Sequence, residues 1–193
     1  MAERYYVLID ATPQSHAPFF DESPIFQTWL KVYSDVPEAL KFISAIKLPY
    51  SVKVYLARDN ILDDGLRSPI DNKMRTLIQT LSDLNAIHRI TVFCPNMNND
   101  PEVQIRAIVG DPRSIDEVIS VDNLRMKMCE EGISHFREQI SRCKHGYDTH
   151  LLPNFSENMQ ALMEYLRTIM NERRPEEDAL VEQHSNKPGE EVA

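Results

Sequence analysis

The stretch Arg4-Tyr-Tyr-Val-Leu-Ile-Asp10 decides the fold. Five apolar residues, Tyr5 to Ile9, follow one another without a break and end at a carboxylate. The run is rich in strand-favouring residues and is shorter than a buried helix, so it predicts a strand covered on both faces. We expect this strand to be the first and central strand of a parallel sheet. Asp10 then stands at its carboxyl end, where open α/β sheets place their binding sites.

Further strands and helices alternate along the chain. The other strands are expected at residues 29–33, 51–57, 89–94 and 103–109. The helices are expected at residues 19–28 and 36–46, along the apolar stripe that begins at Met74, and after a capping box at residues 114–117. This alternation predicts an α/β fold with a doubly wound, mostly parallel five-stranded sheet. The short connection between the fourth and fifth strands leaves an antiparallel edge strand open.

From about residue 122 the apolar pattern changes to that of two long amphipathic helices. They predict a helical hairpin that covers the sheet or extends from it to meet a partner. From residue 174 the chain is rich in Glu, Pro, Gly, Asn and Gln and almost lacks aromatic residues, which predicts a disordered acidic tail. We therefore expect an α/β domain at residues 1–120, a helix pair at 121–173 and a tail at 174–193.

Composition limits the class of protein. Acidic residues outnumber basic ones by 30 to 21, and this excess disfavours sequence-independent binding of nucleic acid. The three cysteines are odd in number and irregularly spaced, which favours reduced thiols inside a cell. Met1 lies only a few residues before the first strand, which leaves no room for a signal peptide, and no apolar run approaches bilayer length. These features predict a cytoplasmic protein without a membrane partner.

Several side chains with possible chemistry are expected where strands end. They are Asp10, Asp35, Arg58, Asp59, Cys94 and Asp111. Carboxylates that gather at one rim can hold Mg2+. The same residue types also cap helices and shape turns for purely local reasons, and we favour that interpretation. None of the five glycines falls in a phosphate-loop spacing, which argues against dinucleotide binding. We therefore assign no catalytic residue, metal or cofactor.

The strand that ends at Asp10, followed by alternating units over about 120 residues, resembles the receiver domain of response regulators. The resemblance covers about residues 5–119. In that family, acids after the first strand hold Mg2+, and an Asp at the end of the third strand accepts a phosphoryl group. A Ser or Thr ends the fourth strand, and a Lys ends the fifth.

This chain departs from the receiver pattern at most of these positions. Asp10 matches one of the first acids, but Ala57 or Arg58 stands at the acceptor position and Asp59 follows late. Cys94 stands near the hydroxyl position, and Gly110-Asp111 replaces the Lys. An acceptor without the Mg2+ cluster and the Lys lacks the positive charge that phosphoryl transfer needs. The resemblance thus implies a degenerate pseudo-receiver, used in signalling for protein–protein interaction.

A second resemblance points to another class. Metal-dependent nuclease domains of the PIN and NYN type also open with a strand that ends in Asp and gather further acids at the sheet rim. Asp10, Asp59 and Asp111 would then hold Mg2+ and activate water for phosphodiester hydrolysis. The acidic net charge disfavours this function, which stays the alternative.

The predicted helix pair carries the hypothesis of a partner surface. Its candidate residues are Met128, Phe136, Met159, Leu162, Leu166 and Met170. Methionine side chains adapt to partner helices, although a stripe at helical spacing is more often ordinary core. The leading hypothesis is a non-enzymatic regulatory or scaffold module that binds a protein partner or forms a homo-oligomer.

Overall fold

A computed structural model describes residues 4–47, 50–58, 70–84, 87–94, 102–103, 105–106, 115–144 and 148–185 of the 193-residue chain. The chain divides into two compact units, Met1–Met128 and Cys129–Ala193. The boundary between the two units falls inside a long helix, α7 (Val121–Lys144).

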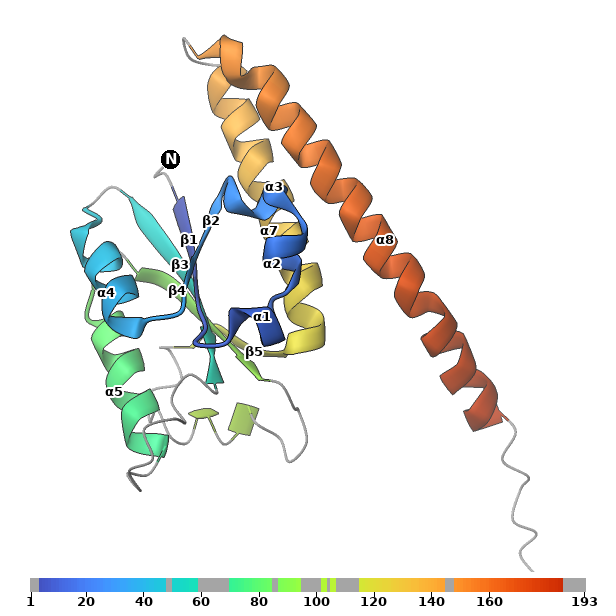
Figure 1. Cartoon of the computed structure of the whole chain (residues 1–193), viewed down its shortest axis with the longest axis horizontal. Helices are drawn as coiled ribbons and strands as arrows, with labels where there is room; N and C mark the ends of the chain where they lie inside the picture. The colour runs from blue at the N-terminus through green and yellow to red at the C-terminus, as the bar shows by residue number, and fades with distance from the viewer. Residues whose placement is uncertain are drawn as a thin grey trace, which may run out of the picture. The chain divides into compact units, whose positions relative to one another are not determined.

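The first unit contains a five-stranded, all-parallel sheet (Figure 1). Its strands are β1 (Arg4–Ile9), β2 (Leu30–Tyr33), β3 (Ser51–Ala57), β4 (Ile87–Cys94) and β5 (Glu117–Ser120). The spatial order is β2-β1-β3-β4-β5, which is the flavodoxin-type order of doubly wound sheets. The predicted α/β doubly wound, parallel sheet is thus confirmed. Strand β1 is paired on both sides as expected, but β3 rather than β1 occupies the middle of the sheet.

Short helices follow β1 where the sequence predicts a loop and then one helix. They are α1 (Pro13–His16), α2 (Phe19–Glu22) and α3 (Pro24–Gln27). Pro13 and Pro24 stand in the first turns of α1 and α3, where a missing N–H costs no hydrogen bond. The longer helices of this unit are α4 (Val36–Ala45) and α5 (Ile70–Ser82), close to their predicted positions.

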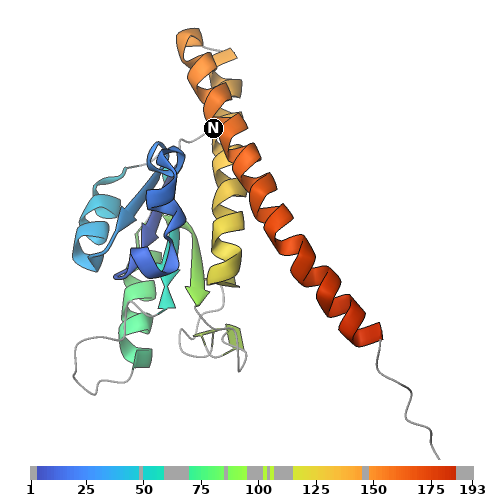
Figure 2. The same cartoon turned by 45° about the vertical axis from the view of Figure 1, so that its right-hand side comes forward.

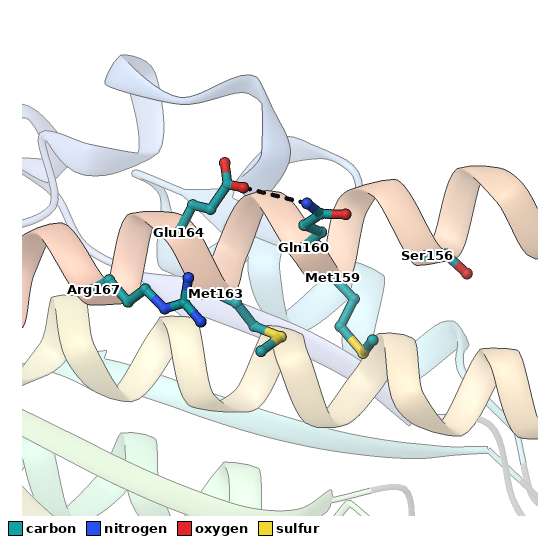
Figure 3. A pocket seen from close by; sticks show the side chains of 6 residues that line it. All are labelled: Ser156, Met159, Gln160, Met163, Glu164 and Arg167. Atoms are coloured by element: carbon teal, nitrogen blue, oxygen red, sulfur yellow. Dashed lines mark hydrogen bonds between the residues drawn. The ribbon is translucent and has the colours of Figure 1, made fainter.

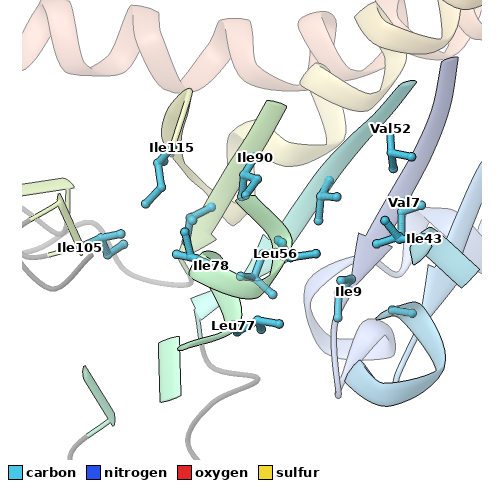
Figure 4. Packing of buried hydrophobic residues seen from close by; sticks show 14 of the residues in the cluster. Val7, Ile9, Ile43, Val52, Leu56, Leu77, Ile78, Ile90, Ile105 and Ile115 are labelled. Carbon is cyan, nitrogen blue, oxygen red and sulfur yellow. The ribbon is translucent and has the colours of Figure 1, made fainter. Parts of the chain in front are cut away.

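Both faces of the sheet are buried. On one face, Val7 and Ile9 pack with Leu56 of β3, Ile43 of α4 and Ile78 of α5 (Figure 4). On the other face lie the short helices α1 to α3, on the opposite side from α4 and α5 (Figure 1). There the ring of Tyr6 meets that of Trp29 edge to face, with centroids 5.0 Å apart. Coverage on both faces explains the uninterrupted apolar run in β1.

The predicted fifth strand at 103–109 is wrong. Residues 102–103 and 105–106 are helical, and the rest of that stretch lies outside the described residues. The fifth strand is Glu117–Ser120, where the capping box predicted a helix, and it runs parallel to β4. Its start is held by Asp116, whose N–H donates to the carbonyl of Ile90 at 2.8 Å. A four-residue edge strand has too weak a sequence pattern to outweigh the local capping signal.

The second unit is a helical hairpin. The part of α7 from Cys129 is followed by a 3-10 turn, η2 (Thr149–Leu151), and by α8 (Leu152–Ser185) (Figure 2). The rings of Phe136 in α7 and Phe155 in α8 lie with their centroids 6.1 Å apart. The predicted hairpin is present, and α7 continues through Gly132 without a break.

Helix α8 continues beyond its predicted end. It reaches Ser185 and so includes residues 174–185, which were expected to be disordered. Six of these twelve residues are Glu, Ala, Leu or Gln, which have high helix propensities, and that local preference favours continuation of the helix past Pro175. The remaining part of the predicted tail, residues 186–193, lies outside the described residues.

Candidate functional site

Asp10 is fully buried at the carboxyl end of β1. Its backbone N–H donates to the carbonyl of Tyr33 at 2.9 Å, which extends the pairing of β1 with β2 by one residue. Its Oδ1 atom accepts the backbone N–H of Thr12 at 2.9 Å. A carboxylate that is removed from water requires such donors.

The ring of His16 is the second partner of the Asp10 carboxylate. Nδ1 of His16 lies 3.1 Å from Oδ2 and 3.2 Å from Oδ1 of Asp10. A carboxylate only accepts hydrogen bonds, so this contact places a proton on Nδ1 and leaves the lone pair of the neutral ring on Nε2. The side chain of His16 is 15% exposed, which leaves the ring within reach of solvent.

Helix α1 explains how His16 returns to Asp10. Its single turn begins after Thr12, with Pro13 in the first position, and closes with the N–H of Ala17 donating to the carbonyl of Pro13 at 2.7 Å. His16 is the last residue of this turn. Sequence reasoning missed His16 because it treated residues 11–18 as a loop. The Thr-Pro pair, which is typical of a helix start, is the signal that could have found it.

The small side chain of Ala57 makes room for the histidine. Ile9 pairs with Leu56, so Asp10 stands opposite Ala57, and Ala57 in turn pairs with Phe93. The ring of His16 also lies edge to face with that of Phe93, at 6.4 Å between centroids. Because Asp10 and Phe93 are two strand spacings apart, about 10 Å, the imidazole spans the end of β3 above Ala57.

The other predicted rim residues that the structure describes, Asp35, Arg58 and Cys94, form no cluster with this pair. Arg58 directly follows Ala57, is half-buried, and has no ion pair or hydrogen bond to the described residues. Asp35 is exposed and precedes α4, but its side chain makes no capping hydrogen bond. Cys94 is fully buried in the core on the sheet face opposite Asp10. Asp59 and Asp111 lie outside the described residues.

A row of buried polar side chains crosses the same sheet face, and sequence reasoning missed it. Tyr55 pairs in register with Thr91, and both are fully buried. Lys53 is 4% exposed, and its Nζ lies 5.6 Å from the centre of the Tyr55 ring. At the end of the row, Glu117 and Lys127 form an ion pair at 2.9 Å.

A second candidate site is a shallow groove of about 390 Å³ along α8 (Figure 3). It is lined by Ser156, Met159, Gln160, Met163, Glu164 and Arg167. Met159 and Met163 project from the same side of the helix, with Arg167 beside Met163. The side-chain amide of Gln160 donates to Glu164 at 3.3 Å along the polar edge of the groove. Further along the helix, Met170 is 57% exposed.

The predicted partner residues on the helix pair fall into two groups. Met128, Phe136 and Leu162 are buried, so their side chains belong to the interior of the chain and not to its surface. Met159 and Leu166 are half-buried, and Met170 is exposed. The division follows from helix geometry, because residues 162 and 169 form one stripe and residues 163 and 170 form the next, about 100° around the helix.

Comparison of the chain with protein-family models and with curated proteins found no match. Within the described ranges, no three His, Cys, Asp or Glu side chains are grouped so that they could hold a metal ion. Among the described helices, none combines the length and the apolar character needed to cross a membrane. The fold and the two candidate sites are therefore the features of this chain that bear on its function.

Proposed function

We propose that this chain is a non-enzymatic regulatory or scaffold module of receiver-like fold, which associates with a second copy of itself through α8. The observation that carries the proposal is the exposed methionine stripe beside the buried stripe of α8. Met163 is 40% and Met170 57% exposed, while Leu162 and Ile169, one residue earlier, are buried.

The exposed stripe has the spacing of a helix–helix seam. Met159, Met163, Leu166 and Met170 are separated by four, three and four residues, which is the a/d spacing of a coiled coil. Leu162 and Ile169 already give α8 a buried apolar stripe, so a second apolar stripe is not needed to bury the helix. Flexible, polarizable methionines suit a surface that packs against another helix.

The stripe is also self-complementary, and this favours a second copy over an unrelated partner. Its spacing is the same in both directions about a point between residues 164 and 165. A twofold axis at that point would pair Met163 with Leu166 and Met159 with Met170 of an antiparallel copy. Each side chain of the stripe then meets an apolar side chain.

The polar edge of the groove fits the same arrangement. Under that twofold axis, Arg167 of one copy comes to the height of the hydrogen-bonded Gln160 and Glu164 of the other. The side-chain oxygens of Gln160 and Glu164 are both within reach of a long guanidinium side chain. The charges and the apolar pattern of the groove therefore both favour a second copy of the chain as the partner. Exposed charged pairs of this kind contribute about 0.2–1 kcal/mol each to the free energy of association. The methionines therefore supply most of that free energy.

The sheet rim supports a non-enzymatic role. Asp10, the residue at the position of a receiver's first acids, is already engaged by Thr12 and His16. At the end of β3, where a receiver carries its phosphoacceptor, stands the buried methyl group of Ala57. The three cysteines are buried and form no disulfide, which supports a reducing, cytoplasmic setting. A Mg2+-dependent PIN or NYN-type phosphodiesterase stays the alternative, because two of its three acids lie outside the described residues.

Sedimentation equilibrium over a concentration series tests the proposal. We expect the apparent mass of the wild type to rise from 22.3 kDa toward twice that value, with a dissociation constant on the order of micromolar or weaker, as is typical of small interfaces. Met163→Glu or Met170→Glu places a charge in the seam and should keep the chain monomeric.

Ala161→Glu is the matched control, because Ala161 is exposed on the far side of the same helix. It adds the same charge outside the seam and should leave the association unchanged. A wild type that stays monomeric into the millimolar range would end the proposal. Equal effects of the control and the seam variants would show that the association uses another surface.

A further inference from the structure

We propose that the thioether sulfurs of Met163 and Met170 are sites of reversible oxidation by hydroperoxides, and that the resulting sulfoxides separate two associated copies of the chain. This inference rests on the proposed association through α8, because it assigns a chemical control to the same stripe. The modification and the class of its oxidant are new, since the association itself requires neither.

The sulfur atoms that solvent reaches most easily lie on α8. Met163 is 40% and Met170 57% exposed. The other methionines that the structure describes are more enclosed: Met128 is fully buried, and Met126 and Met159 are half-buried. Oxidation of a thioether depends on the access of the oxidant to sulfur. We therefore expect Met163 and Met170 to react first.

The thiols of the chain, which are the usual targets of peroxides, are withdrawn from solvent. Cys94 and Cys129 are fully buried, and Cys143 is 5% exposed. Structural cysteines that are buried in this way are inert toward oxidants. The exposed thioethers of α8 are therefore the sulfur atoms of the described chain that a peroxide meets first.

The chemistry is a transfer of one oxygen atom. A lone pair of the thioether sulfur attacks the hydroperoxide, so that the S–O bond forms as the O–O bond breaks. The proton of the transferred oxygen moves to the leaving oxygen, and water or an alcohol is released. Sulfur loses two electrons to the peroxide. In the reverse direction, two thiols of a sulfoxide reductase return these electrons, become a disulfide and release the oxygen as water.

A sulfoxide does not fit the apolar seam between two copies. Under the twofold axis between residues 164 and 165, Met163 meets Leu166 and Met170 meets Met159 of the second copy. The sulfoxide oxygen accepts hydrogen bonds, but neither of the facing side chains carries a donor. Burial of an acceptor without a donor is unfavourable, so each sulfoxide weakens the association.

The separate copy, in contrast, holds a donor for the new oxygen. The side chain of Arg167 lies beside that of Met163 on the same helix (Figure 3). Its guanidinium can donate a hydrogen bond to the sulfoxide oxygen of Met163, and it is then drawn away from Gln160 and Glu164 of a second copy. Association in turn covers the thioethers, so peroxide reaches them in the separate copy and shifts the equilibrium by mass action.

Limited treatment of the full-length chain with hydrogen peroxide tests this inference. Peptide mass spectrometry locates the sulfoxides, and sedimentation equilibrium gives the dissociation constant before and after treatment. We expect Met163 and Met170 to gain oxygen before the fully buried Met128 does. The dissociation constant should rise roughly tenfold or more, because a polar group would be buried without a donor. Methionine sulfoxide reductases with dithiothreitol should restore the association, whereas dithiothreitol alone should not.

Two variants separate this stripe from the other sulfur atoms. The double variant Met163→Leu, Met170→Leu keeps apolar side chains in the seam, and the same peroxide dose should not change its own dissociation constant. Met126→Leu removes a half-buried methionine of α7 and should keep the peroxide response of the wild type. An oxidised wild type that associates as before, or an equal response of the double variant, would overturn the inference and leave the association in place. A wild type that is monomeric before treatment would end both proposals.

Discussion

A buried carboxylate needs donors for its lone pairs, and Asp10 finds them within six residues of its own chain. Thr12 donates its backbone N–H and His16 its ring, because one turn of helix brings the histidine back over the strand end. The sequence made Asp10 predictable, since a carboxylate after an apolar run marks a strand end. It did not make His16 predictable, since that contact depends on a four-residue helix whose signal is a single Thr-Pro pair.

At the scale of residues, a second histidine, His135, leads to a prediction about how stability depends on pH. Burial lowers the pKa of His135 below its usual 6.5, Glu138 acts in the opposite direction, and Arg142 lowers the pKa further. The folded state therefore binds this proton more weakly than the unfolded chain does. Above pH 6.5 both states are neutral and stability is retained, and stability falls as the pH decreases below 6.5 toward the folded-state pKa.

Replacement of this histidine tests the linkage. We expect the stability of His135→Gln to fall less than that of the wild type as the pH is lowered from 7.5 to 5.5. Thermal unfolding in matched buffers measures this difference. The exposed His150, replaced in the same way, should leave the wild-type pH dependence in place. A His135→Gln curve parallel to that of the wild type would mean that this ring does not couple to folding.

At the scale of elements, the strength of the local pattern decided what could be predicted. Strand β3 was located at its observed bounds, because seven residues of strand-favouring sequence stand between clear turn signals. Strand β5 was missed, since four residues with one buried apolar side chain, Val118, form their strand only by pairing with β4. Helix α8 ends later than predicted, because the helix propensity of residues 174–185 outweighs their acidic composition.

Adjacent residues of α8 give a direct test of its two stripes. Leu162→Ala removes a fully buried side chain and should lower the free energy of unfolding by about 2–5 kcal/mol. Met163→Ala truncates a side chain that is 40% exposed and should cost less than about 1 kcal/mol. Urea unfolding, followed by helical circular dichroism at a concentration where the chain is monomeric, measures both. A larger loss of stability for Met163→Ala than for Leu162→Ala would contradict the assignment of Leu162 to the buried stripe and of Met163 to the exposed stripe.

At the scale of the whole molecule, each of the two units carries its own kind of candidate site. The sheet unit places an Asp–His pair and an arginine at the carboxyl edge of a flavodoxin-type sheet. The hairpin unit places an apolar stripe with a polar edge on a long helix. The fold class was predictable because alternation of strands and helices is a long-range pattern. The two candidate sites were less predictable from the sequence, since each depends on the side of a helical turn on which a residue lies.

The measurement that tests the central claim most directly is the distance between spin labels on two copies of α8. The native cysteines are buried, so a spin label reacts with a cysteine that is introduced at the exposed position 164 or 171. An antiparallel pair with its twofold axis between residues 164 and 165 separates the two labels along the helix by about 2 Å at residue 164 and by about 20 Å at residue 171. We predict that the dipolar distance is clearly longer for Asn171→Cys than for Glu164→Cys. Equal distances at the two positions, or no dipolar coupling at high concentration, would contradict the account.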